Sequence, residues 1–320
     1  MEATSKFRDA LPQLRGKPFL TDGGIETTLI FHRGLDLPLF AAFDLLKDDE
    51  GTETLAAYYR PYLELARDGG LGFVLESPTW RASPRWAAEI GYSNDELDSM
   101  NRKAIELMAR LRDEFSSDVE PIVISGCVGP QDDGYNPKVK MSGEEAEAYH
   151  SMQIGTFTDS PADMVTAITM TYVEEALGVT RAAQTAGIPV AISFTLETDG
   201  RLPSSQPLGE AIDEVDAATT DGPAYYMINC AHPTHFGSIF EDDAGWTQRI
   251  VGLRANASTM SHVELDEATE LDAGDPVDLA TRYAGLRTRL PRLSVLGGCC
   301  GTDDRHVRAI RDVWLEGASA

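Results

Sequence analysis

The feature that most constrains the fold is a repeated alternation of short apolar runs with longer helix-like stretches. Eight runs have the length and the β-branched or aromatic content of buried strands. Turn sequences such as AGIP (186–189) and DGG (68–70) close helices just before the next strand. The predicted strands are 19–22, 72–76, 121–126, 164–169, 189–195, 224–230, 250–255 and 293–298, and the helical stretches between them include 52–67, 95–115, 143–155, 173–186, 208–218 and 277–290.

This alternation predicts an α/β protein in which crossover helices join the strands of a parallel sheet. Eight units favour a closed (β/α)₈ TIM barrel over an open doubly wound sheet. No GxGxxG or P-loop pattern follows any predicted strand, which argues against a dinucleotide or NTP site. No linker or repeat divides the 320 residues, so we expect one domain over residues 1–320.

The charge balance limits the partners that we expect. The chain has 52 acidic and 27 basic residues and a formal net charge of −25, which repels phosphate backbones and anionic membranes. The densest basic segment, RYAGLRTRLPR (282–292), is typical of a solvated helix face and its exit loop. We therefore expect no nucleic-acid or membrane partner, and the sequence leaves assembly into a homo-oligomer open.

Targeting signals and disulfide frameworks are not indicated either. No apolar run approaches the roughly 18 residues that a membrane span needs, and the N-terminus lacks the apolar core of a signal peptide. We therefore expect a cytoplasmic protein. The four cysteines are too few and too scattered for the framework of a small secreted domain, so we expect reduced thiols.

Polar and glycine-rich clusters follow seven of the predicted strands. The C-terminal ends of all strands in such a barrel meet on one face, where reactive groups gather. Three of the four cysteines lie in the clusters after the sixth and eighth strands, so we expect their sulfurs to converge at the barrel mouth. The clusters are DGG (22–24), ESPTW (76–80), GCVGP (126–130), TLETDG (195–200), NC (229–230), Asn256 and GGCCG (297–301).

Three cysteine thiolates form a donor set that suits zinc, and a catalytic zinc site keeps a fourth position open. A thiol in that position is held as thiolate at neutral pH and can attack an electron-poor methyl group. However, adjacent cysteines are not the usual zinc-knuckle spacing, and buried cysteines are often small packing residues. Residue types alone leave both interpretations open, although Gly297, Gly298 and Gly301 favour a close approach of the backbone to a metal or ligand.

Three motifs together carry a family resemblance. The sequences LTDGGIETTL (20–29), INCAHP (228–233) and GGCCGTDDRHVRAI (297–310) resemble the homocysteine S-methyltransferase family, which includes betaine, S-methylmethionine and cobalamin-dependent methionine-forming enzymes. Weaker matches follow in family order, so the resemblance covers nearly the whole chain. They are SPTWRAS (77–83), GCVGP (126–130), FTLETDGRLPS (194–204) and ANA (255–257).

The resemblance implies a zinc-dependent S-methyltransferase of the EC 2.1.1 class. Such an enzyme transfers a methyl group from a small methylated donor to a zinc-bound thiolate, here homocysteine, and forms methionine. The implied Zn²⁺ ligands, which are also the catalytic residues, are Cys230, Cys299 and Cys300. The implied substrate-binding residues are Asp22 and Gly23, which match the segment that holds the amino-acid end of homocysteine, the rim residue Thr79, and Asn229 and Asn256, which brace the site.

One departure from the family pattern concerns the acceptor. The family usually has a glutamate at the end of the fourth strand that binds the amino group of homocysteine, but alignment on VEEA (173–176) places Ile168 and Thr169 there. A different thiol acceptor, or a compensating acid such as Glu76 or Glu197, are both open. A non-catalytic zinc-binding or redox-sensing barrel is a further alternative, because vicinal thiols oxidise readily. The methyl donor is not indicated.

Several other residues near these motifs have two interpretations. For Cys127 we favour a packed small residue over a fourth metal ligand. For His232 and His235 we favour a place at a helix start over contact with a metal or donor. Cation–π contact with a cationic donor and ordinary core packing are the two interpretations for Phe31, Phe40, Phe43 and Trp80.

Overall fold

Eight parallel strands close into a barrel in the computed structural model, which describes residues 4–240 and 245–317. Each strand pairs with the next in chain order, and β1 and β8 close the ring through the pairs Phe19–Val295 and Leu20–Leu296. The predicted α/β class and (β/α)₈ barrel are therefore confirmed. The strands are β1 (Phe19–Leu20), β2 (Gly72–Glu76), β3 (Ile122–Val128), β4 (Met164–Met170), β5 (Val190–Thr195), β6 (Tyr225–Asn229), β7 (Ile250–Ala255) and β8 (Val295–Gly298).

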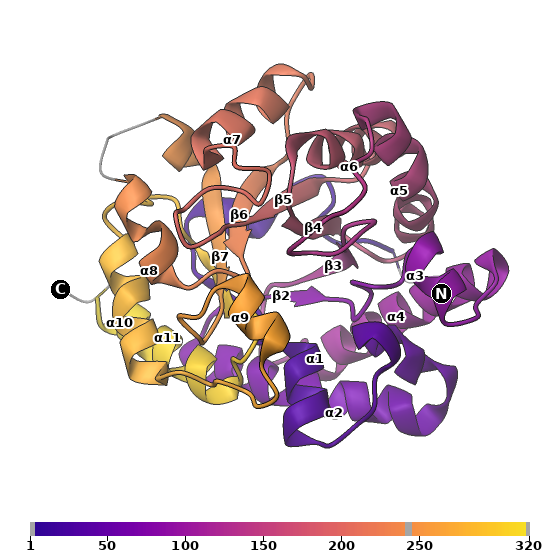
Figure 1. The fold of residues 1–320 in the computed structure, drawn as a ribbon. Coiled ribbons are helices and arrows are strands. Elements are labelled where there is room, and N and C mark those ends of the chain that lie inside the picture. Colours follow the sequence, from indigo (N-terminus) through magenta and orange to yellow (C-terminus); the bar gives the residue numbers. More distant parts are fainter. Residues whose placement is uncertain (1–3, 241–244, 318–320) are drawn as a thin grey trace.

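Helices surround the strands on the outside of the barrel (Figure 1). The longer ones are α2 (Asp49–Gly69), α4 (Asn94–Phe115), α5 (Gly143–Thr158), α6 (Val173–Ala186), α7 (Leu208–Ala217), α10 (Pro276–Leu286) and α11 (Asp304–Glu316). Shorter helices lie in the connections: α1 (Ile25–Thr27), α3 (Pro84–Glu89), α8 (Pro233–Phe236) and α9 (His262–Glu267). Short 3₁₀ helices occupy Pro12–Arg15, Pro38–Phe40, Ala42–Lys47, Gly237–Phe240 and Gly245–Arg249, and a π-helical turn occupies Thr28–His32.

All eight predicted strands are present, and β2 and β7 have the predicted bounds. The end of β3 lies two residues beyond its prediction because the strand continues to pair with β4 as far as Val128. The outer helix α11 lies outside the predicted helical stretches. It begins at a side-chain cap, since Asp303 accepts a hydrogen bond from the backbone N–H of Arg305 at 3.0 Å.

The interior of the barrel changes character along its axis. Alternate residues of a strand point to the same face, so one inward row contains Tyr225, Met227 and Asn229 of β6. Tyr225 and Met227, at the start of the strand, belong to a buried apolar cluster inside the barrel, and Leu11 from the segment before β1 also belongs to it. The upper positions are polar and bonded to each other, as Ser193 Oγ donates to Asn229 Oδ1 at 2.6 Å. The sequence thus builds an apolar floor beneath a polar mouth.

The first and last barrel segments meet at this mouth. The backbone N–H of Gly298 donates to the carbonyl of Asp22 at 2.9 Å, and the N–H of Gly24 donates to the carbonyl of Thr302 at 3.0 Å. The N–H of Gly301 donates to Thr27 Oγ1 at 3.1 Å. Residues 22–27 and 298–302 therefore form one continuous wall of the mouth.

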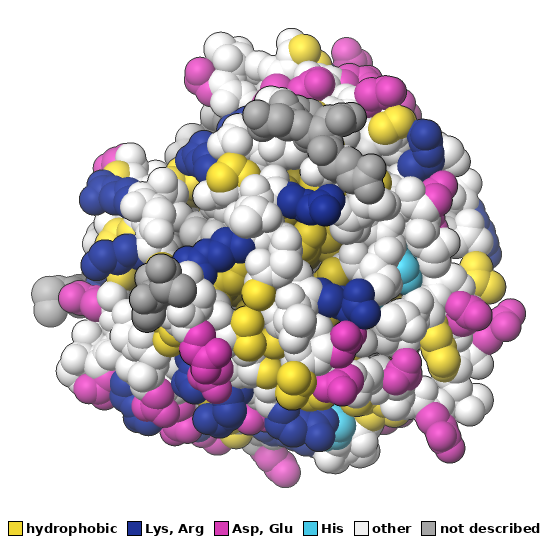
Figure 2. Space-filling view, turned by 90° about the vertical axis from the view of Figure 1, so that its left-hand side faces the viewer, with side chains coloured by type: hydrophobic (Ala, Val, Ile, Leu, Met, Phe, Trp, Pro, Cys, Tyr) yellow, Lys and Arg dark blue, Asp and Glu magenta, His cyan; other side chains and the backbone are white. Residues whose placement is uncertain are grey.

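The outer surface carries both charge signs. Figure 2 shows basic and acidic side chains interspersed on one face of the molecule, without a continuous basic stripe there. Within the basic segment 282–292, Arg282 pairs with Asp278 at 2.6 Å, as the solvated-face interpretation expects. Among the helices of residues 4–240 and 245–317, none combines the length and the apolar character needed to cross a membrane.

Candidate functional site

The barrel mouth brings together the three cysteines that the sequence analysis singled out. Cys230 directly follows β6, and Cys299 and Cys300 directly follow β8, so the sulfurs come from two strands that flank β7. Their Sγ atoms all lie within 4.8 Å of one another. Cys127 is not part of this cluster. The sulfur cluster is thus contributed by two sequence segments about 70 residues apart that the closed barrel makes neighbours.

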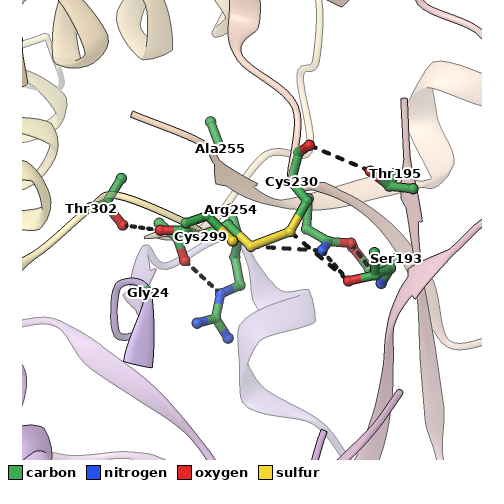
Figure 3. The surroundings of a disulfide bond; sticks show 12 residues. Gly24, Ser193, Thr195, Cys230, Arg254, Ala255, Cys299 and Thr302 are labelled. Carbon is green, nitrogen blue, oxygen red and sulfur yellow. Dashed lines mark hydrogen bonds between the residues drawn. A yellow bond between two sulfur atoms is a disulfide. The ribbon is translucent and has the colours of Figure 1, made fainter. Parts of the chain in front are cut away.

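A sulfur–sulfur bond joins Cys230 and Cys299 in this structure (Figure 3). The expectation of four reduced thiols is therefore wrong for this pair, because strands β6 and β8 direct both side chains to the same point. Cys127 and Cys300 are free thiols. Oxidation and metal binding compete for the same sulfurs, since zinc takes thiolate and not disulfide sulfur.

The donor set and its surroundings fit zinc once the pair is reduced. Zinc–sulfur bonds of about 2.3 Å in a tetrahedron place sulfurs about 3.8 Å apart, which a cluster contained within 4.8 Å can match with small side-chain movements. The glycines that flank Cys299 and Cys300 also leave no room for a side chain or have a backbone conformation that favours glycine. Gly301 has φ +78°, and a side chain at Gly298 would collide with Thr302.

The backbone of Cys230 is held in an uncommon conformation. Its φ of +52° lies in the left-handed region, which costs a non-glycine residue on the order of 1 kcal/mol or more. Three hydrogen bonds fix it there. Its N–H donates to the carbonyl of Arg254 at 3.2 Å, and its carbonyl accepts from His262 Nε2 at 2.7 Å and from Thr195 Oγ1 at 3.4 Å. In this conformation the sulfur of Cys230 points toward Cys299 (Figure 3).

Asn229 braces the cluster from below. It is fully buried, its Oδ1 accepts from the N–H of Thr169 at 2.9 Å and from Ser193 Oγ at 2.6 Å, and its Nδ2 donates to Thr169 Oγ1 at 2.9 Å. The same Nδ2 lies 3.9 Å from Cys299 Sγ. Asn229 thereby ties β4 and β5 to the sulfurs.

Tyr135 approaches the third sulfur from a loop after β3. Its hydroxyl lies 3.6 Å from Cys300 Sγ, and its ring stacks on His262 with centroids 3.9 Å apart. Burial raises the pKa of Tyr135 well above its ordinary value, so its hydroxyl keeps its proton at neutral pH and can donate to the sulfur. Burial also raises the pKa of Cys300, and the hydrogen bond from Tyr135 opposes that rise.

A cavity of ≈ 340 Å³ opens beside the sulfurs, a volume within the range of small-molecule sites. Among the predicted substrate-binding residues, Asp22 and Gly23 line it. Thr79 lies behind the wall, where its Oγ1 donates to the carbonyl of Cys127 at 2.7 Å. Asn229 and Asn256 are also buried outside the lining. The structure thus places two of the five at the cavity surface and three in its support.

A buried arginine, which the sequence analysis missed, organises the acidic side of the cavity. Arg254 of β7 donates to Asp22 Oδ1 at 2.7 Å, to Glu76 Oε2 and to the carbonyl of Gly23 at 3.1 Å. Burial raises the pKa of both carboxyls, and Arg254 opposes that rise. Burial would lower the pKa of Arg254, but the two carboxylates raise it, so it stays protonated.

The position of the expected amine-binding glutamate is apolar. Ile168 lines the cavity there. Of the two compensating acids, Glu76 is engaged by Arg254, and Glu197 pairs with His262 Nδ1 at 3.1 Å outside the cavity lining. Several other acids of the cavity lining have no ion pair among the described residues, and burial raises the pKa of one of them, Glu26, to about 7.

The other residues with two interpretations are Cys127, two histidines and four aromatic residues. Cys127 lines the cavity wall but is buried, and burial raises its pKa well above the usual value, which fits the packing interpretation. His232 caps the short helix α8, as its Nδ1 accepts from the N–H of Thr234 at 3.3 Å, and His235 bonds the carbonyl of Thr259. Of the aromatic residues, Phe31, Phe40 and Trp80 line the cavity and Phe43 belongs to the core.

Comparison with known proteins places this geometry in context. A sequence model of the family described as homocysteine S-methyltransferase matches residues 19–314. The chain is 21% identical to Homocysteine S-methyltransferase 1 of Arabidopsis thaliana over 97% of each chain. It is 24% identical to Selenocysteine Se-methyltransferase of Brassica oleracea var. italica over 91% of this chain and 87% of that protein.

Solved structures share the fold. The homocysteine methyltransferase MmuM from Escherichia coli superposes in its metallated form with a TM-score of 0.69 at 18% identity, covering 93% of this chain and 97% of that one. Its oxidised form superposes with a TM-score of 0.72 at 19% identity, covering 94% and 99%.

Proposed function

Because the chain belongs to the homocysteine S-methyltransferase family, we propose that it is a zinc-dependent enzyme that methylates a small thiol, with homocysteine as acceptor and methionine as product. The observation that supports this most directly is the cluster of three sulfurs beside a cavity of small-molecule size. The partners are then one small thiol and one small methylated donor. The single domain, the cytoplasmic location and the absence of a nucleic-acid partner stay predictions of sequence and composition.

In this proposal Cys230, Cys299 and Cys300 hold the zinc in their reduced form. When bound, zinc supplies a positive charge that keeps the acceptor thiol deprotonated yet nucleophilic at neutral pH. The chain itself sets the position of the ligands, through the strained backbone of Cys230 and the brace of Asn229. Tyr135 places a hydroxyl donor at the sulfur cluster, where negative charge accumulates.

The other cavity residues orient the reactants. Asp22 and Gly23 lie beside the sulfurs and are proposed to contact the amino-acid end of the acceptor. The apolar side chain of Ile168 contributes a wall that excludes water. The acceptor sulfur gives an electron pair to the donor methyl carbon as the bond between that carbon and the leaving group breaks. The reaction therefore needs alignment and charge placement and no proton transfer at carbon.

A zinc and turnover assay on matched cysteine variants tests the proposal. Reduced wild-type protein should contain zinc and form methionine from homocysteine with at least one member of a panel of methylated sulfonium and ammonium donors. Cys230→Ser should lose both zinc and methionine formation. Cys127→Ser, a buried thiol outside the cluster, should keep its zinc.

The alternatives give different results in the same assay. Zinc binding without methylation of homocysteine or any other thiol would contradict the enzymatic proposal. It would support a zinc-binding or redox-sensing barrel instead. Methylation of another thiol in preference to homocysteine would follow from Ile168 at the amine-binding position. A Cys230→Ser variant with full zinc content and turnover would remove Cys230 from the ligand set.

A further inference from the structure

Arg81 is a buried cation in the wall of the substrate cavity. It follows β2 in the segment SPTWRAS, is only 8% exposed and lines the cavity. Two indole rings hold its guanidinium between them, with Cζ 4.1 Å from the ring centroid of Trp80 and 3.6 Å from that of Trp86. Such a sandwich fixes the plane of the guanidinium and leaves its edge as the group that can bind a ligand.

The hydrogen-bonding capacity of Arg81 is largely unused. Its Nη1 makes one long contact, 3.5 Å, to the carbonyl of Asp132, and its buried Nε has no partner. Within residues 4–240 and 245–317, no carboxylate oxygen lies within 4.0 Å of this guanidinium. Burial lowers the pKa of Arg81 to about 10, so it remains charged at neutral pH. Buried cations are normally paired, because desolvating an unpaired charge is costly.

Three acids act on the charge of Arg81, and two of them, Asp132 and Asp133, are engaged by other groups. Asp132 accepts from Arg85 Nη1 at 2.6 Å and from the backbone N–H groups of residues 138 and 139. Asp133 caps the turn that follows it, accepting from two backbone N–H groups at 2.9 Å each. Glu26 attracts Arg81 across the cavity without reaching ion-pair distance. None of these three acids therefore forms an ion pair with Arg81.

We propose that Arg81 is a specificity-determining residue that binds the carboxylate of a substrate in this cavity. The inference rests on the proposed methyl-transfer function and names a substrate class for it, molecules that carry a carboxylate. A carboxylate can accept two parallel N–H bonds from one guanidinium edge, which suits a planar group held between two rings. Both the acceptor amino acid and an amino-acid-like donor carry this group, so the test has an arm for each.

The test compares ligands with and without a carboxylate. For the acceptor arm these are homocysteine and 3-aminopropanethiol, and for the donor arm S-methylmethionine and trimethylsulfonium. Binding to reduced, zinc-loaded protein is measured by isothermal titration calorimetry, and kcat and KM are measured where methyl transfer occurs. The variants are Arg81→Met, Arg81→Lys and the matched control Arg85→Met. Arg85 also stacks on Trp86, at 5.2 Å, but it is paired with Asp132 and lies outside the cavity lining.

Arg81→Met should weaken binding of the carboxylate ligand of one arm by about 10- to 100-fold, and raise its KM, while the ligand without a carboxylate binds as to wild type. Arg81→Lys should give a smaller loss, because lysine keeps the charge and loses the two-pronged geometry. Arg85→Met should leave the affinities unchanged. The arm that responds identifies which substrate Arg81 holds.

Two outcomes overturn the inference. An Arg81→Met protein with wild-type affinity for all four ligands shows that Arg81 binds no substrate carboxylate. Equal losses for ligands with and without a carboxylate show that Arg81 only holds the two indoles in place. Carboxylate-selective binding without methyl transfer would instead support the inference and reject the proposed function. A wild-type protein that binds none of the four ligands rejects both.

Discussion

Replacing Arg254 by methionine is expected to lower the free energy of unfolding by about 3–5 kcal/mol at pH 8. Arg254, Asp22 and Glu76 are 6%, 3% and 4% exposed, so removing the guanidinium leaves two carboxyl groups buried without their cation. The carbonyls of Gly23 and Gly298 also lose a donor. Removal of one partner of a buried ion pair costs this much because the remaining charge cannot return to water.

The loss should depend on pH, with a sign set by the carboxyl groups. Burial already raises the pKa of Asp22 and Glu76, and without Arg254 nothing in the triad opposes that rise. The folded variant then binds more protons than the unfolded chain between the two sets of pKa values. Its stability therefore falls as pH rises through the folded-state pKa values, and the deficit against wild type is larger at pH 8 than at pH 5.

Urea unfolding followed by circular dichroism at pH 5 and pH 8 measures both quantities. Arg282→Met is the matched control, because Arg282 makes an exposed pair with Asp278 whose loss should cost no more than about 0.5 kcal/mol. A deficit below about 1 kcal/mol for Arg254→Met at pH 8, or one that does not change between the two pH values, would contradict the description of the triad as a buried charge network.

Three further outcomes are expected. Protein purified without reductant should contain little zinc, and reduction should raise the content to about one per chain, because the bond between Cys230 and Cys299 withholds two ligands. Tyr135→Phe should lower turnover about fivefold through loss of its hydroxyl near Cys300, with little change in unfolding free energy. Asp303→Ala should lower the free energy of unfolding by about 1 kcal/mol, because α11 loses its N-terminal cap. Since neighbouring histidine and arginine side chains lower the pKa of Asp303 despite its burial, its contribution in the wild type is lost as pH falls below the ordinary carboxyl range.

Each of these outcomes has a clear contrary. Full zinc content in unreduced protein would show that the sulfur–sulfur bond does not form in solution. Wild-type turnover for Tyr135→Phe would show that its hydroxyl does not act on the sulfur. An unchanged melting curve for Asp303→Ala at neutral pH would show that α11 does not depend on its cap.

The fold was largely predictable because it follows from short-range periodicity. Apolar runs of strand length separated by helical spacing require a parallel sheet, and eight of them close a barrel. Strand ends were less predictable, as β3 shows, because they are set by pairing with a neighbour that sequence periodicity does not reveal. Helix α11 was not among the predicted helical stretches because its start signal was overlooked. That signal is Asp303, the N-cap residue directly before the helix.

The site was predictable where residue type carried the chemistry. Cysteines after two different strands pointed to one sulfur cluster, and Asp22 and Gly23 line the cavity. Arg254 was missed although it is a charged residue inside the apolar run IVGLRA (250–255), where burial demands a partner. Arg81 and Glu26 had no such signal, because an unpaired charge is defined only by the three-dimensional neighbours that it lacks.

The wall formed by residues 22–27 and 298–302 has a consequence for biogenesis. Its three hydrogen bonds join positions more than 270 residues apart, so this contact has one of the longest loops in the molecule to close. All eight strands precede Cys299 and Cys300 in the chain, so these two sulfurs are synthesised after the residues of the whole barrel. The proposed metal site therefore requires this late segment, and a truncation that ends before Val295 would lack both the closing strand and two of the three sulfurs.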